Sequence, residues 1–120
     1  MALDRFVYWK KNKRSPSLKR LREVLEDYLG DAAVKVELAD RNRIIALLRG
    51  RPTFPFRRVH GYKDMGRVFE KQDERWIEVY RHTGAIDVIT RLSDEYTNVV
   101  AEGFARLCAR FWQGRYKHPD

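Results

Sequence analysis

The clearest pattern in the sequence is the helical spacing of apolar residues between Tyr96 and Trp112. Ser93 is a typical N-cap residue, the acidic pair Asp94-Glu95 suits a first turn, and Gly114 suits the end of a helix. The spacing predicts one long amphipathic helix of about five turns near the end of the chain. Its apolar stripe consists of Val99, Val100, Phe104, Leu107, Cys108, Phe111 and Trp112.

A second helical pattern lies near the start of the chain. Ser15-Pro16 is typical of an N-cap followed by the first helical position, and Gly30 suits the end of the helix. Charged residues occupy the remaining positions, so we expect another amphipathic helix. Its apolar stripe consists of Leu18, Leu21, Val24, Leu25, Tyr28 and Leu29.

Five segments have the composition or the alternation of β-strands. The polar residues 40–43 and the dipeptide Thr83-Gly84 suit the turns of two hairpins. Ile44–Leu48 is apolar throughout, which is typical of a strand buried on both faces near the centre of a sheet. The five predicted strands cover residues 3–10, 33–39, 44–48, 76–80 and 86–91.

The order of these elements is β-α-β-β, an irregular loop at residues 49–73, then β-β-α, followed by an expected frayed tail at residues 115–120. Antiparallel hairpins with two amphipathic helices are best accommodated by an α+β fold. We predict a single α+β domain over residues 1–120, with a five-stranded, mainly antiparallel sheet and both helices packed on one face.

Positive charge is concentrated in the first half of the chain. The net charge is +8; residues 1–60 contain 15 Lys and Arg against 7 Asp and Glu, whereas residues 61–120 contain 10 of each kind. This asymmetry predicts an electropositive face that attracts an anionic partner. A net charge of this size also serves solubility, so both interpretations stay open.

The cations of the first half lie in or beside the connections between predicted elements. We expect the connections after the first and third strands to leave the sheet at related ends and to combine their cations into one anion-binding surface, with nucleic acid as the first candidate partner. The candidate residues are Lys10, Lys11, Lys13, Arg14, Arg41, Arg43, Arg49, Arg51, Arg57 and Arg58.

Aromatic residues near these cations could stack on unpaired bases. Phe54 and Tyr62, in the loop that follows the third strand, are the candidates for stacking or for contact with a partner. Tyr8 and Trp9 have the same chemistry, but their place in an apolar strand predicts that they belong to the core.

A protein partner is the alternative. The apolar arc of the last helix is wider than a helix on a sheet requires, and Trp112 could anchor a homodimer or another protein there. The aromatic loop at residues 52–62 could serve the same purpose. On this interpretation the chain is a protein-interaction module, such as an adaptor, an inhibitor or an immunity-type protein.

The sequence shows no catalytic, metal-binding or cofactor-binding motif. His60, His82 and His118 are dispersed, and Cys108 lies in a helix stripe that we expect to be buried. Glu78 and Asp87 could face each other across the last hairpin, but we expect them on a solvated face beside Arg81 and Arg91. The sequence therefore predicts a non-enzymatic protein without metal or cofactor.

The expected location is the cytoplasm. No apolar run approaches the roughly 18 residues of a membrane helix, and residues 1–11 lack the apolar core of a signal peptide. The single cysteine, Cys108, fits a reducing compartment.

Overall fold

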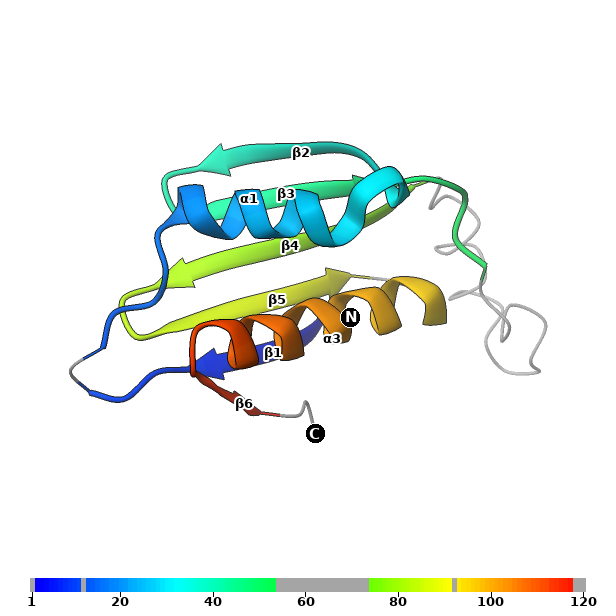
Figure 1. Cartoon of the computed structure of the whole chain (residues 1–120). Coiled ribbons are helices and arrows are strands. Elements are labelled where there is room, and N and C mark those ends of the chain that lie inside the picture. The colour runs from blue at the N-terminus through cyan, green and yellow to red at the C-terminus, as the bar shows by residue number, and fades with distance from the viewer. Residues whose placement is uncertain (1, 12, 54–73, 92, 118–120) are drawn as a thin grey trace.

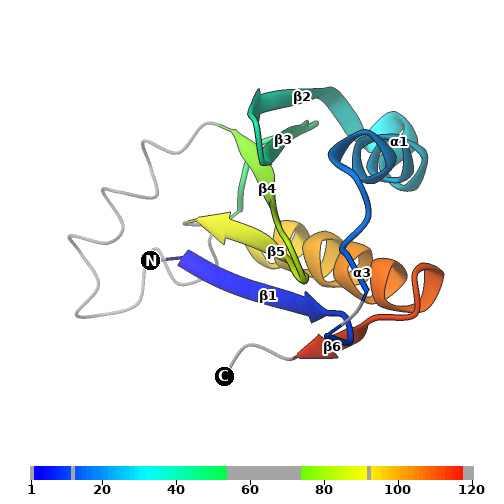
Figure 2. The same ribbon diagram turned by 90° about the vertical axis from the view of Figure 1, so that its left-hand side faces the viewer.

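Six antiparallel strands and two α-helices make up the part of the chain that the computed structural model describes, namely residues 2–11, 13–53, 74–91 and 93–117 (Figures 1 and 2). This confirms the predicted α+β fold, with one strand more than expected. In chain order the elements are β1 (Ala2–Tyr8), α1 (Leu18–Leu29), a 3-10 turn (Gly30–Ala32), β2 (Ala33–Asp40), β3 (Arg43–Leu48), β4 (Arg75–His82), β5 (Ala85–Arg91), α3 (Glu95–Phe111) and β6 (Arg115–Lys117).

The strands follow the order β2-β3-β4-β5-β1-β6, and every neighbouring pair is antiparallel. The strands β1, β2 and β4 therefore run in one direction, and β3, β5 and β6 run in the other. Because α1 carries the chain from β1 to the far edge of the sheet, β1 and β2 are separated by three strands.

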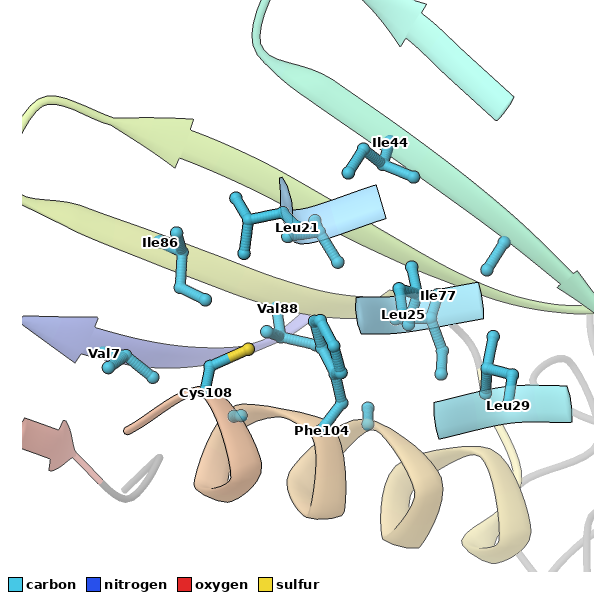
Figure 3. Close-up of a cluster of buried hydrophobic side chains, with 14 of the residues drawn as sticks. Val7, Leu21, Leu25, Leu29, Ile44, Ile77, Ile86, Val88, Phe104 and Cys108 are labelled. Carbon is cyan, nitrogen blue, oxygen red and sulfur yellow. The ribbon is translucent and has the colours of Figure 1, made fainter. Parts of the chain in front are cut away.

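Both helices pack on the same face of the sheet, which we call the covered face. The helix α1 lies over β2 and β3, and α3 lies over β1, β5 and β4 (Figures 1 and 2). Aliphatic side chains from the strands meet Phe104 of α3 and three leucines of α1 in one continuous core (Figure 3). The labelled core side chains are Val7, Leu21, Leu25, Leu29, Ile44, Ile77, Ile86, Val88, Phe104 and Cys108.

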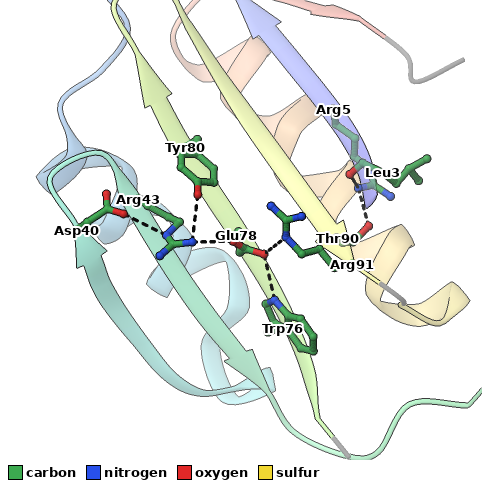
Figure 4. Close-up of polar contacts among 9 residues, drawn as sticks. All are labelled: Leu3, Arg5, Asp40, Arg43, Trp76, Glu78, Tyr80, Thr90 and Arg91. Atoms are coloured by element: carbon green, nitrogen blue, oxygen red, sulfur yellow. Dashed lines mark hydrogen bonds and ion pairs between the residues drawn. The ribbon is translucent and has the colours of Figure 1, made fainter. Parts of the chain in front are cut away.

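A buried arginine joins β1 to α3 within this layer. Arg5 is 2% exposed. Its guanidinium donates hydrogen bonds to Thr90 Oγ1 at 3.1 Å (Figure 4) and to Asn98 Oδ1 at 2.9 Å. Burial lowers the pKa of Arg5, but the bonds to neighbouring acceptors keep its polar atoms satisfied.

The end of the chain differs from the expected frayed tail. Arg115–Lys117 pair with β1 as the short strand β6, with Arg115 opposite Tyr8 and Lys117 opposite Phe6. A Cβ at Gly114 would lie 2.8 Å from Val7 Cγ1, so only glycine allows this close return of the chain.

Both helices begin later than predicted. The N-cap of α1 is Ser17, whose Oγ accepts a hydrogen bond from Arg20 N, and the N-cap of α3 is Asp94, whose carboxylate accepts one from Thr97 N. Ser15 is buried instead and donates its hydroxyl hydrogen to the carbonyl oxygen of His82. Neighbouring Ser and Asp residues are all good caps, so composition alone does not distinguish them.

The strand β3 is not central, in contrast to the prediction, because it lies one strand in from the edge. Its Ile44, Ala46 and Leu48 are buried on the covered face, while Ile45 and Leu47 are half-buried on the other. The edge strand β2 leaves Val34 and Leu38 about half exposed, at 53% and 51%.

Neither of the two described helices is long and apolar enough to cross a membrane. Of the predicted loop at residues 49–73, the structure describes residues 49–53. The candidates Phe54, Arg57, Arg58 and Tyr62 lie outside the described residues.

Candidate anion-binding site

Several connections meet at one end of the sheet, on the left of Figure 1. Strands β1, β2 and β4 all finish there, and α1 and β6 begin there. The backbone joins these segments directly: Trp9 N donates to Gly84 O at 2.9 Å, Ser15 N to Thr83 O at 3.0 Å, and Arg81 N to Asn42 O at 2.7 Å. This end is therefore a surface built from segments that are distant in the sequence.

Exposed cations gather on this surface, which we call the basic end. In the segments that form it, residues 9–11, 13–20, 39–43, 81–85 and 112–115, Asp40 is the one carboxylate. Asp40 Oδ2 lies 3.3 Å from Arg43 Nε, so its charge is already paired. The exposed cations of the basic end are Lys10, Lys11, Lys13, Arg14, Lys19, Arg20, Arg41 and Arg115.

The first turn of α1 adds positive charge to the basic end. It contains Lys19 and Arg20 and no acidic residue, and the last turn contains no basic residue. Acidic side chains are usually favoured at the start of a helix, whereas this first turn is basic. The helix dipole and these two side chains therefore add their positive potentials at the same place.

Half of the predicted anion-binding residues come together at the basic end. Lys10, Lys11, Lys13, Arg14 and Arg41 lie there, and Lys13 Nζ donates a hydrogen bond to Gln113 Oε1 at 3.1 Å. None of these five residues forms an ion pair within the described part of the chain.

Arg49 and Arg51 lie at the opposite end of the sheet, so the prediction of one combined surface was wrong for them. The strands β1 and β3 run in opposite directions, and their following connections therefore leave from opposite ends. A six-residue strand such as β3 separates these ends by about 20 Å. Arg49 Nε donates to Asp31 O at 2.8 Å, which gives it a structural contact there.

Arg43 is part of the basic end, but its charge is compensated. Its Nη1 lies 3.3 Å from Glu78 Oε1 and donates to Tyr80 Oη at 3.0 Å, and its Nε faces Asp40 (Figure 4). The guanidinium carbon lies 5.4 Å from the centre of the Tyr80 ring. Arg43 therefore supports the surface more than it adds free charge to it.

Glu78 and Asp87 are buried, at 3% and 7% exposed, so the prediction that they lie on a solvated face was wrong. Glu78 accepts hydrogen bonds from Arg91 Nε at 2.7 Å and from Trp76 Nε1 at 3.2 Å, in addition to its ion pair with Arg43 (Figure 4). Glu78 is thus the centre of a compensated ionic cluster.

Asp87 lacks such compensation. Burial, and then the hydrogen bond and charge of Asp4, raise the pKa of Asp87 to about 7. Its Oδ1 accepts no hydrogen bond from any described residue. Asp87 lies opposite Tyr80 on β4 and opposite Phe6 on β1.

Neither Cys108 nor His82 belongs to a reactive or metal-binding cluster among the described residues. Burial raises the pKa of the Cys108 thiol well above its ordinary value, which makes the thiol unreactive. No group of three or more potential metal ligands occurs within the described ranges. His60 and His118 lie outside those ranges, and His82 is exposed at the β4–β5 turn.

Trp112 is part of the core and not a free anchor. Its ring packs against the core cluster, and its backbone oxygen accepts a hydrogen bond from Trp9 Nε1 at 2.8 Å. The exposed apolar side chains on α3 are instead Tyr96, Val99 and Phe111.

Sequence reasoning missed three cations of the basic end, namely Lys19, Arg20 and Arg115. The absence of acidic residues from the first turn of α1 was a visible signal for two of them, whereas Arg115 depends on the unexpected strand β6. Trp9 is in the core as predicted, but Tyr8 is 41% exposed.

Comparison with protein-family models, with curated proteins and with solved structures finds no match to this chain. A proposal about its function therefore rests on the arrangement of its own side chains.

Proposed function

We propose that this protein is a small non-enzymatic binding module whose basic end binds the phosphate backbone of a nucleic acid. The observation that carries the proposal is the gathering of eight exposed cations beside a single, already paired carboxylate. The cytoplasm, where nucleic acid is available, is the proposed location.

A polyanion suits this surface better than a single small anion. The cations come from the β1–α1 connection, the start of α1, the β2–β3 turn and the start of β6, so they are spread over the whole end of the sheet. Repeated phosphates can meet several such groups at once, and arginine can contact each phosphate through two N–H groups. The release of counterions from the nucleic acid then supplies much of the affinity.

A protein-interaction module is the second candidate. Tyr96, Val99 and Phe111 are 44%, 61% and 56% exposed on α3, and exposed aromatic and aliphatic groups can anchor a protein partner. Such an interface would tolerate salt, whereas binding through the basic end would not.

Fluorescence anisotropy with labelled single- and double-stranded oligonucleotides at several salt concentrations tests the proposal. We expect binding at low salt that weakens steeply as salt is added. Arg14→Glu should make the slope of log K against log salt concentration shallower by about 0.7 to 0.9 per lost phosphate contact.

Arg51→Glu is the matched control, because it makes the same charge change at the opposite end of the sheet. We expect a much smaller effect on affinity. Equal effects of the two variants would show that net charge alone governs binding, and no binding to either oligonucleotide at low salt would refute the proposal.

A further inference from the structure

Aromatic side chains lie on the face of the sheet that α1 and α3 do not cover, close to the basic end. We call this second face the open face, because no described element packs on it (Figure 2). Phe6 and Tyr8 of β1 form a stacked pair with ring centres 5.6 Å apart and an interplanar angle of 18°. Tyr80 and His82 of β4 form a second stacked pair, at 6.4 Å and 15°. We call these four residues the aromatic platform.

Strand register places the two ring pairs on either side of β5. Tyr80 lies opposite Asp87, which lies opposite Phe6; His82 lies opposite Ala85, which lies opposite Tyr8. The two pairs are thus separated by one strand, β5, or about 10 Å from β4 to β1. At the outer row, the residue between Tyr8 and His82 is an alanine, so the rings there are not covered by a larger neighbour on β5.

Cations border this platform on the side of the sheet edge. Arg115 lies opposite Tyr8 and Lys117 lies opposite Phe6 in the β1–β6 ladder, and both side chains are exposed. Residues directly opposite each other in an antiparallel pair point to the same face, about 5 Å apart. Arg115 also belongs to the basic end, so the two surfaces are continuous.

The charges and rings of the open face indicate which part of a nucleic acid suits it. The middle of this face contains the carboxyl groups of Glu78 and Asp87, both buried, and a phosphate would be repelled by a carboxylate. Bases carry no such negative charge, and they have the flat faces that stack on aromatic rings.

We infer that the open face binds unpaired bases, so that the ligand of this protein is a single-stranded nucleic acid whose backbone lies along the basic end and whose bases stack on Tyr8 and its neighbouring rings. This inference rests on the proposed function. A duplex keeps its bases stacked on each other and cannot offer their faces to the platform.

The experiment compares single-stranded RNA, single-stranded DNA and duplex DNA of equal length and matched sequence, by anisotropy over a range of salt concentrations. We expect tighter binding of the single strands, with either sugar. Tyr8→Leu should weaken single-strand binding roughly five- to hundredfold. It should leave the salt slope unchanged, because no phosphate contact is lost.

Tyr96→Leu is the control for this variant. Tyr96 is 44% exposed, close to the 41% of Tyr8, but it lies on α3 in the helix layer. We expect the Tyr96→Leu variant to bind single strands with an affinity within twofold of that of the unmodified protein. Circular dichroism should show that both variants are folded.

The outcomes separate this inference from the proposed function. Equal affinities for single strands and duplex, or a Tyr8→Leu variant that binds single strands like the unmodified protein, would overturn the inference and leave a basic end that binds backbone alone. Absence of salt-dependent binding to all three oligonucleotides would overturn the proposed function, and the inference with it.

Discussion

Two aspartates are buried, Asp94 at the start of α3 and Asp87 on the open face. Their surroundings shift the pKa values of the two carboxyls in opposite directions. At the start of α3, Asp94 is 3% exposed. It accepts hydrogen bonds from Thr97 N at 3.0 Å, Thr53 N at 2.9 Å and Arg75 Nε at 3.0 Å. Burial by itself would raise the pKa of Asp94, but these donors outweigh burial and lower the pKa to about 2.

On the open face, Asp87 has an oxygen without a donor and another carboxyl, that of Asp4, beside it. Its pKa rises to about 7 because nothing outweighs burial. A buried carboxylate with a full set of donors stabilises the fold, whereas one without them destabilises it. The difference indicates that the region around Asp94 is built for stability and that the open face contains a polar group the fold does not need.

The two faces of the sheet differ in the same way. The covered face holds mainly aliphatic side chains buried against α1 and α3, together with the hydrogen-bonded Arg5, while the open face holds half-exposed rings, Arg43 and Arg91 around Glu78, and Asp87. The largest losses of stability should therefore come from changes on the covered face, and losses of binding from changes on the open one.

Phe104→Ala should have the largest effect on stability. The side chain is fully buried at the centre of the core, and removal of a buried phenyl ring costs about 3–5 kcal/mol. Urea unfolding followed by circular dichroism measures this loss. Phe6→Ala on the open face is the matched change and should cost less than half as much; an equal cost would contradict the division into two faces.

The raised pKa of Asp87 should make the protein less stable as the pH rises from about 4 to 7. The ordinary pKa of 3.8 applies to the unfolded chain, which therefore loses this proton first, so the folded state binds more protons in this window. The free energy of unfolding should fall by up to about 4 kcal/mol, at about 1.4 kcal/mol per pH unit, and level off above pH 7. Urea unfolding at several pH values measures the fall.

Asp87→Asn removes this titration and should flatten the profile between pH 4 and 7. A variant with the same slope as the unmodified protein would show that other groups are responsible. The charged or titratable groups on the elements around Asp87 are Asp4, Arg5, Glu78, Tyr80, Arg91, Arg43 and Lys117.

Asp94→Asn should lower the free energy of unfolding by about 2 kcal/mol at pH 7, because it removes the charge that Arg75 and the cap donors bind. The pKa of Asp94 is lowered on folding, so its contribution is complete above pH 4 and is lost as the pH falls from about 4 to 2. Acid unfolding followed by circular dichroism should show this loss in the unmodified protein and not in the variant. Identical acid transitions in the two proteins would refute this contribution of Asp94.

Gly114→Ala tests the close packing at the edge of the covered face. The added Cβ would lie 2.8 Å from Val7 Cγ1 and 2.9 Å from Trp9 Cε2, so the core must shift. Overpacking of this kind costs about 1–3 kcal/mol, which thermal unfolding can detect. Gly84→Ala is the control, since nothing lies within 4 Å of its added Cβ; a comparable loss there would indicate a backbone effect.

Tyr8→Leu should have the smallest effect on stability, below about 0.5 kcal/mol, because the ring is exposed and leucine keeps most of the apolar contact. The same variant is expected to bind single strands roughly five- to hundredfold more weakly. A large loss of stability, measured by urea unfolding, would assign Tyr8 to the fold and not to the binding surface.

Part of the candidate site followed from the sequence, because local clusters stay together in any fold. Lys10, Lys11, Lys13 and Arg14 follow each other in one connection and therefore remain neighbours at the basic end. Arg49 and Arg51 lie at the other end because β3 runs opposite to β1, and a strand's direction is not a local property of the sequence. The burial of Glu78 was also unpredictable, since its partners Arg43 and Arg91 come from two other strands.

The sequence by itself determined the two helices, five of the six strands and the α+β class, because hydrophobic periodicity is a local property of the chain. The excess of charge in the first half was equally visible. Only the tertiary structure decided which cations share an end of the sheet, that residues 115–117 pair with β1, and that Tyr8 faces outward while Trp9 faces the core. These features depend on the strand order β2-β3-β4-β5-β1-β6 and its register, which arise from contacts between residues far apart in the chain.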